Sequence, residues 1–151
     1  MSPARALALP PGVTLGSARS IDGVKALLAE RRMPIDDIRD DAIFIVARVG
    51  DELCATAGLE TYGAIALVRS VGVRPTWRRK GIARALCDEI IRRAAAAGVR
   101  KLFLLTTDAQ GFFRGLGFAE VERESLPPAI RETAQFRQLC PQTATAMARD
   151  V

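Results

Sequence analysis

The sequence predicts an α/β fold in which a mixed central sheet of about six to seven strands is flanked by helices. Short runs rich in valine, isoleucine and leucine alternate along the chain with amphipathic segments of helical period. Turn residues join the early runs as hairpins, whereas the later runs are separated by segments long enough to form crossover helices. Antiparallel hairpins followed by crossovers give a mixed sheet that is covered by helices.

The first half of the chain carries the hairpins. Residues 13–17 predict a short strand, and Ser20 is suited to cap a helix over residues 21–32. Pro34 and the acidic run at 36–41 mark a second short helix or a loop. The strands expected next cover residues 42–49, 53–60 and 64–73, with Gly50 in the first connecting turn and Gly63 in the second.

The second half carries the crossovers. Residues 79–97 predict an amphipathic helix that ends at Gly98. A buried strand is expected over residues 101–106, where the centre reads Leu-Phe-Leu-Leu, and a short helix is expected over 109–115. The last elements expected are a strand over 118–124, a helix over 129–138 and a strand over 143–149.

Length and composition predict a single domain over residues 1–151. No apolar run approaches the roughly 20 residues that span a bilayer, and the N-terminal segment lacks the features of a signal peptide. We therefore expect a cytoplasmic protein with no membrane partner. The formal net charge is +5, and basic residues cluster at 74–84 and 92–101. These clusters lack interleaved aromatic side chains, so no nucleic-acid partner is expected.

Histidine is absent from the sequence, which excludes histidine-dependent nucleophile pairs and histidine metal sites. Cys54, Cys87 and Cys140 are far apart and have no Cys-x-x-Cys spacing, so neither a metal site nor a disulfide framework is expected. Any general base must therefore be a carboxylate, a tyrosine, a lysine or a relayed water.

The segment 71–86 carries the strongest functional signal. An apolar strand ends at Pro75, and a basic turn that contains Gly81 leads into the amphipathic helix. The first N–H groups of a helix have no partner within it, and the helix dipole adds positive charge at the same place. Such a turn is suited to bind a diphosphate. An ordinary basic helix cap is the alternative.

Three segments in order resemble the GCN5-related N-acetyltransferases (GNAT). Residues 78–83 read Arg-Arg-Lys-Gly-Ile-Ala, which matches the Arg/Gln-x-x-Gly-x-Gly/Ala signature of that family. Residues 101–106 are similar to its next parallel strand, and residues 109–118 are similar to its Ala-x-x-Phe-Tyr-x-x-x-Gly-Phe element. The resemblance covers nearly the whole chain and implies the GNAT fold with acetyl-coenzyme A as co-substrate.

The resemblance also implies a set of cofactor-binding residues. Val71 and Val73 would pair with the pantetheine arm in a gap between two diverging strands, and the N–H group at Val71 would polarise the thioester carbonyl. Plain core packing is the alternative for both valines. The full set implied is Val71, Val73, Arg78, Arg79, Lys80, Gly81, Ile82, Ala83, Arg84 and Phe113. Phe113 departs from the family, because a tyrosine that protonates the leaving thiolate is common there.

The acceptor side has three candidates. Glu60, at the end of a strand, is the candidate general base; a solvated hairpin carboxylate is the alternative. Arg69 interrupts an apolar strand, so it either pairs with an internal acid or grips an acceptor carboxylate, and we favour the second. The resemblance further implies that Thr133, with Gln135 and Phe136, lines the acceptor pocket, and helix packing is the alternative there.

A finer resemblance concerns residues 58–71 and 127–147. These are similar to the acetyltransferase domain of N-acetylglutamate synthases and to the arsenic-resistance N-acetyltransferase family ArsN2, which implies an amino-acid-like acceptor. Cys140, a single thiol before a proline, makes a poor arsenic site. A non-catalytic acyl-coenzyme A-binding sensor or a protein-interaction module on the same fold is the alternative function. The protein is expected to be a monomer or a homodimer.

Overall fold

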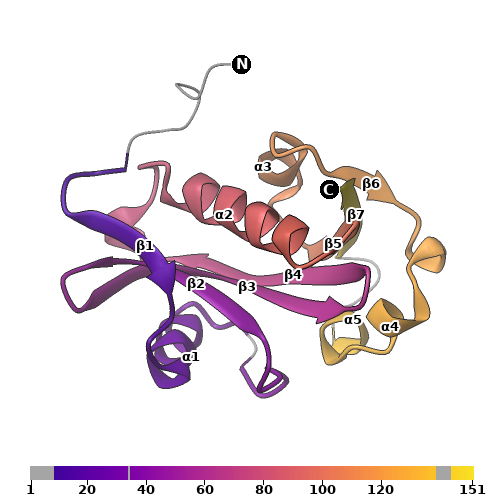
Figure 1. Ribbon diagram of the computed structural model, residues 1–151, viewed down its shortest axis with the longest axis horizontal. Coiled ribbons are helices and arrows are strands. Elements are labelled where there is room, and N and C mark those ends of the chain that lie inside the picture. Colours follow the sequence, from indigo (N-terminus) through magenta and orange to yellow (C-terminus); the bar gives the residue numbers. More distant parts are fainter. Residues whose placement is uncertain (1–8, 34, 139–143) are drawn as a thin grey trace.

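A computed structural model describes residues 9–33, 35–138 and 144–151. It contains a seven-stranded sheet with the order β1-β2-β3-β4-β5-β7-β6 (Figure 1). The strands are β1 (Val13–Ser17), β2 (Ile43–Val49), β3 (Glu52–Tyr62), β4 (Ile65–Val73), β5 (Lys101–Thr106), β6 (Ala119–Val121) and β7 (Thr145–Asp150). The α-helices are α1 (Ile21–Glu30), α2 (Ile82–Ala96), α3 (Gln110–Arg114), α4 (Pro128–Arg131) and α5 (Ala134–Gln138). Short 3₁₀ turns lie at η2 (Pro75–Trp77) and η3 (Arg123–Ser125).

The predicted mixed sheet is confirmed. Strands β1 to β4 are antiparallel neighbours, β4 and β5 are parallel, and β7 lies antiparallel between β5 and β6. Helix α2 makes the crossover from β4 to β5. Figure 1 shows α2 and α3 on one side of the sheet and α1, α4 and α5 on the other.

Strands β4 and β5 pair over only three positions. The pairs are Ile65 with Lys101, Ala66 with Leu102 and Leu67 with Phe103, although both strands continue beyond them. A bulge in β4 follows directly. Gly58 of β3 pairs with Arg69 and Thr56 pairs with Gly72, so two β4 residues stand opposite one β3 residue. A gap therefore opens between β4 and β5 at their C-terminal ends.

The two faces of the sheet have separate cores. Ile82, Leu86 and Ile90 of α2 pack on Leu59 and other side chains of one face. On the opposite face, α1 packs on β2 through Val24, Leu28, Phe44 and Val46. Leu126 and Ile130 cover Leu67 and Phe103 farther along that face. The sheet is thus buried on both sides, and the end of α1 and the start of α2 lie on opposite faces.

Several predicted boundaries were wrong for local reasons. The helix expected over 79–97 begins only at Ile82, because Arg79 and Gly81 have left-handed φ values of 62° and 80°. The helix expected over 129–138 is divided at Thr133, and the strand expected over 118–124 covers only Ala119–Val121. Strand β3 runs two residues farther than expected, to Tyr62. Residues 36–41 contain no helix, so the loop alternative holds there.

Gly58 sits where a side chain does not fit. A Cβ atom there would lie 2.7 Å from Cε1 of Phe44 and 3.2 Å from the carbonyl oxygen of Arg69. We therefore expect Gly58→Ala to lower the free energy of unfolding by about 1–3 kcal/mol. Urea denaturation measures the change. Gly16→Ala is the matched control, because nothing lies within 4 Å of a Cβ atom at that strand position. Equal stability of the two variants would contradict this account of the packing.

Candidate active site

The gap between β4 and β5 is the mouth of a cleft of about 800 Å³. The cleft is bordered by the bulged half of β4, the end of β5, the turn before α2, helix α3 and the end of α1. The residues that line it are 31–33, 68–73, 77–79, 81–84, 104–109 and 112–113. The only non-glycine residues with left-handed φ in the described ranges, Arg32, Ser70 and Arg79, all line this cleft. Backbone strain concentrated in one place is typical of a functional site.

The turn before α2 presents a row of backbone donors to the cleft. Gly81 precedes the helix, and the first N–H group with a helical partner belongs to Ala85, which donates to the carbonyl of Gly81 at 3.1 Å. The N–H groups of residues 79–84 therefore have no backbone acceptor. Arg78, Arg79 and Arg84 are exposed around them. These groups and the helix dipole fit a diphosphate.

The predicted cofactor residues gather at this cleft with one exception. Val71, Val73, Arg78, Arg79, Gly81, Ile82, Ala83, Arg84 and Phe113 all line it. Lys80 is exposed and does not line it. From Val68 onward β4 has no strand partner on the β5 side, so its backbone can pair with an extended ligand. The individual roles of these residues stay predictions.

Phe113 is buried and packs edge-on against Phe118, with ring centroids 5.7 Å apart. Sequence reasoning missed two hydroxyl groups that line the same cleft. The Oγ of Ser70 accepts the Nε–H of Arg69 at 2.9 Å, and the Oγ1 of Thr106 accepts the N–H of Ala109 at 3.1 Å. Each hydroxyl keeps its own hydrogen for a ligand. Their positions as hydroxyls in otherwise apolar strands were the signal available in the sequence.

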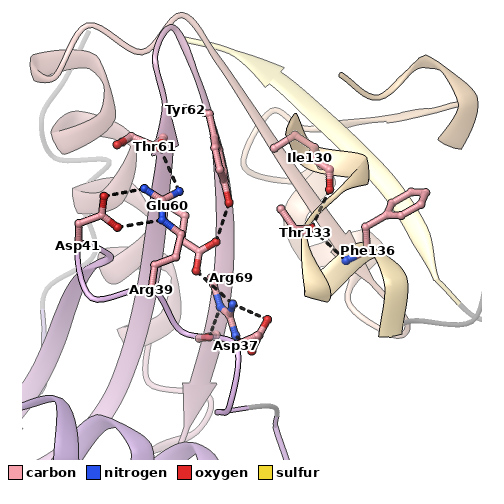
Figure 2. A network of polar contacts seen from close by, with 11 residues as sticks. Asp37, Arg39, Asp41, Glu60, Thr61, Tyr62, Arg69, Ile130, Thr133 and Phe136 are labelled. Carbon is pink, nitrogen blue, oxygen red and sulfur yellow. Dashed lines mark hydrogen bonds and ion pairs between the residues drawn. The ribbon is translucent and has the colours of Figure 1, made fainter. Parts of the chain in front are cut away.

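Glu60, Asp37 and Arg69 form a buried ion cluster on the α1 face, shown in Figure 2. Arg69 donates to both oxygens of Asp37 at 2.8 Å and to Oε2 of Glu60 at 3.2 Å. The hydroxyl of Tyr62 donates to Oε1 of Glu60 at 3.0 Å. The side chains of Arg69, Asp37 and Glu60 are 1%, 8% and 3% exposed. Glu60 is therefore not the solvated carboxylate that was the alternative.

The charges in this cluster stabilise one another. Burial alone would raise the pKa of Asp37, but the hydrogen bonds and charge of Arg69 outweigh it and hold that pKa below its ordinary value. Burial would lower the pKa of Arg69, and the two carboxylates raise it instead. Burial and the nearby Glu60 carboxylate raise the pKa of Tyr62 against the opposing effect of Arg39. Tyr62 therefore stays protonated and able to donate.

Arg39 ties the cluster to the loop after α1. Its guanidinium carbon lies 4.6 Å from the centroid of the Tyr62 ring, and its Nη1 donates to the carbonyl of Thr61 at 3.2 Å. Asp41 holds the other edge of the guanidinium at 2.8 and 2.7 Å (Figure 2). The aromatic ring that orients Glu60 is thus itself fixed from the outside.

The structure bears on two acceptor-side predictions. Arg69 pairs with internal acids, which was the alternative that we did not favour. A direct hydrogen bond from Arg69 to an acceptor carboxylate stays a prediction. It would need N–H groups of the guanidinium that do not already donate to Asp37. The Oγ1 of Thr133 donates to the carbonyl of Ile130 at 2.7 Å and accepts the N–H of Phe136 at 3.1 Å. That hydroxyl joins α4 to α5, as the helix-packing alternative predicts.

Phe136 stacks on Arg123, whose guanidinium carbon lies 4.4 Å from the ring centroid, and packs with the side chains over Leu67. The side chain of Gln135 and the whole of Cys140 lie outside the described residues. No helix in the described ranges is both long and apolar enough to cross a bilayer.

Comparisons with known proteins assign the family. Residues 18–118 match the acetyltransferase (GNAT) family. The chain is 33% identical over 97 residues to an uncharacterised N-acetyltransferase of Chlorobaculum tepidum, covering 64% of this chain and 60% of that one. It is 30% identical over 102 residues to an amino-acid acetyltransferase of Aeromonas salmonicida, covering 67% of this chain and 23% of that one. The chain belongs to the GNAT family of acetyltransferases.

Two solved structures show the same fold. N-acetylglutamate synthase from Neisseria gonorrhoeae, complexed with coenzyme A and N-acetyl-glutamate, has a TM-score of 0.77 and 22% identity over 95% of this chain and 36% of that one. The protein Rv2747 from Mycobacterium tuberculosis, also complexed with coenzyme A, has a TM-score of 0.71 and 19% identity over 91% of this chain and 99% of that one. The cleft with its row of N–H groups fits acetyl-coenzyme A.

Gly81 tests the diphosphate turn. An alanine there must adopt φ near 80°, which costs about 1–2 kcal/mol, or the turn must reorient its N–H groups. We expect Gly81→Ala to raise the Kd of coenzyme A about tenfold, measured by calorimetry. Gly98→Ala is the matched control, because Gly98 has φ 87° just beyond the other end of α2, away from the cleft. An equal loss of affinity in both variants would show that strain in α2, rather than the turn, is responsible.

Arg69→Met tests the buried cluster. The substitution leaves two buried carboxylates without a cation, so we expect the free energy of unfolding to fall by about 3–5 kcal/mol at pH 7. Denaturant titration measures the loss. Arg19→Met is the control, because the exposed Arg19–Asp51 pair is worth about 0–1 kcal/mol. Similar losses in the two variants would contradict the account.

The same cluster predicts how the free energy of unfolding changes as the pH falls. The pKa of Asp37 is lowered on folding, so its contribution is fully present above its unfolded value of 3.8 and is lost as pH falls through the lower folded value. Asp37→Asn should therefore flatten the decrease of stability below about pH 4. Thermal unfolding from pH 2.5 to 6 checks this, and identical slopes in the wild type and the variant would exclude the linkage.

Proposed function

We propose that the protein is an acetyl-coenzyme A-dependent N-acetyltransferase that acetylates the amino group of a small amino acid or amino-acid analogue. The observation that carries the proposal is the cleft itself. On the α2 side of the sheet, the cleft has a row of N–H groups without backbone acceptors. On the opposite side, the segment after α1 borders the cleft, and the buried cluster of Asp37, Glu60 and Arg69 lies nearby. The similarity to an amino-acid acetyltransferase supports the acceptor class.

The proposed reaction is direct attack of a neutral amine. Bound acetyl-coenzyme A supplies an activated acyl thioester. Glu60 is buried and does not line the cleft, so in this proposal it takes the proton of the acceptor ammonium through a water molecule, while Tyr62 and Arg69 orient its carboxylate. The backbone N–H of Val71 donates to the carbonyl oxygen as negative charge develops there. Arg69 donates a hydrogen bond to Glu60 and is a positioning residue.

A covalent route through cysteine is disfavoured. Burial raises the pKa of Cys87 to about 12, and burial also raises the pKa of Cys54. Both thiols are therefore protonated at neutral pH, and neither Cys54 nor Cys87 lines the cleft. Direct transfer needs no protein nucleophile.

The leaving thiolate needs a different partner from the tyrosine common in the family. Phe113 stands at that position and cannot donate a proton. The hydroxyls of Ser70 and Thr106 line the cleft with hydrogens to donate, and solvent can complete the protonation. Phe113 is also the observation that favours the second candidate function, a sensor that binds acyl-coenzyme A without turnover.

Glu60→Gln separates these functions. We expect kcat to fall about 10²- to 10⁴-fold while the Kd of acetyl-coenzyme A stays within about twofold, because only the base is removed. The measurement is thiol release over a panel of amino acids that includes an arsenic-containing analogue, since ArsN2 enzymes are among the families that the sequence resembles. Glu52→Gln, at the exposed start of β3, is the control. Cofactor binding without turnover of any amine by the wild type would establish the sensor instead.

A further inference from the structure

A second cavity, of about 450 Å³, lies at the edge of the sheet where β1 ends. Strand β1 stops at Ser17, and the N–H of Ala18 makes one further bond, to the carbonyl of Phe44 at 2.9 Å. The walls of the cavity come from the end of β1, from α1, from the loop after α1, from the start of β2 and from α2. No residue that lines this cavity also lines the cleft, so the two are separate sites.

The lining of the second cavity is largely apolar. Ile21, Ile38 and Ile43 contribute to it, and Ile21 is 40% exposed. Only two other large apolar side chains in the described ranges, Phe112 and Val151, are comparably exposed. The volume lies within the range of small-molecule sites, which combine apolar walls with a few polar groups. The cavity therefore fits a small ligand that has an apolar body.

The polar groups of the second cavity favour an anion. Lys25, Arg39 and Arg93 line it, against one acid, Asp40. Lys25 has no ion-pair partner among the described residues, and residues 1–8, 34 and 139–143 contain no acidic side chain. The bonds that Arg39 and Arg93 make to described residues use three and two of the five N–H groups of each guanidinium. Both guanidinium groups therefore have N–H groups left for an oxyanion.

The loop after α1 joins the second cavity to the buried cluster. Residues 36–41 contain neither helix nor strand, and residues 38–40 line the cavity. On its other side the loop supplies Asp37, which pairs with Arg69. Arg39 belongs to both sides, because it also lies over the ring of Tyr62, which donates to Glu60 (Figure 2). A ligand in the cavity therefore contacts the segment that orients the candidate base.

We propose that the second cavity is an effector site for a small molecule that joins an oxyanion, carboxylate or phosphate, to an apolar body. Its occupation holds the loop after α1 in place and thereby raises the rate of acetyl transfer. Segments without regular structure open at a low cost in free energy, and a ligand that binds only the closed loop suppresses that opening. The ligand class rests on the cavity alone, whereas the effect on the rate rests on the proposed function.

Calorimetry of the coenzyme A-bound protein tests the site, because saturating coenzyme A occupies the anion-binding groups of the cleft. The probes are phenylacetate and phenyl phosphate. Phenylacetamide is the neutral counterpart, and inorganic phosphate is the anion without an apolar body. We expect at least one of the two probes to bind about tenfold more tightly than both counterparts, and the tighter probe identifies the oxyanion.

Two variants locate the binding. Lys25→Gln and Arg93→Gln should each weaken it about tenfold, because each removes a charged donor. Arg92→Gln is the matched control. Arg92 pairs with Glu89, as Arg93 does, but it does not line the cavity. Its substitution should leave the affinity for the probe within about twofold.

Turnover tests the coupling to the active site. The bound probe should raise kcat about fivefold and leave the KM of acetyl-coenzyme A within about twofold. Tyr62 does not line the cavity, and Tyr62→Phe removes the hydroxyl that reaches Glu60. This variant should therefore keep its affinity for the probe and lose the activation, measured as the ratio of kcat with and without the probe.

Each failure has its own meaning. The site is overturned by equal binding of the anionic and neutral probes, by no binding of either anion at about 10 mM, or by unchanged affinity in both Lys25→Gln and Arg93→Gln. Binding with an unchanged kcat overturns the effector role. If the wild type acetylates no acceptor, the proposed function fails, and calorimetry still decides whether the cavity binds the anion.

Discussion

The structure depends on the point at which β4 and β5 stop pairing. Three paired positions keep the strands in one sheet, and the bulge at Ser70 and Val71 then turns β4 away. If the parallel ladder continued, the side chains and backbone of β4 would be buried within the sheet, and no cleft would exist. The same divergence leads β4 into the turn before α2, so one local irregularity creates both the channel and the anion site at its end.

The buried ion cluster is the second constraint, and it acts on orientation rather than on stability. Exchanging a buried ion pair for apolar side chains is often neutral or stabilising, so Asp37, Glu60 and Arg69 are poorly explained as a device for stability alone. What the cluster provides is a fixed carboxylate. Tyr62 and Arg69 hold one oxygen each of Glu60, and Arg39 holds Tyr62 in turn (Figure 2).

The sequence predicted the sheet and the place of the turn before α2, because both follow from local patterns, whereas the cofactor roles of the residues there stay predictions. Strand periodicity, the break at Pro75 and a glycine before an amphipathic helix each act within a few residues. The contacts on the acceptor side of the cleft could not be predicted from local sequence patterns. Asp37 and Arg69 are 32 residues apart, and Arg31 meets Gly72 through the packing of α1 on β4. The divided helix at Thr133 depended on a side-chain cap that periodicity does not reveal.

The central claim is that the diverging strands hold the pantetheine arm while the start of α2 holds the diphosphate. Titration of ¹⁵N-labelled protein with coenzyme A, followed by backbone amide NMR, tests this claim most directly. The account predicts that the largest shift changes fall on the amides of residues 79–84 and 68–73, with smaller changes at residues 104–109. Changes concentrated elsewhere, for example on β1 and β2, would contradict it.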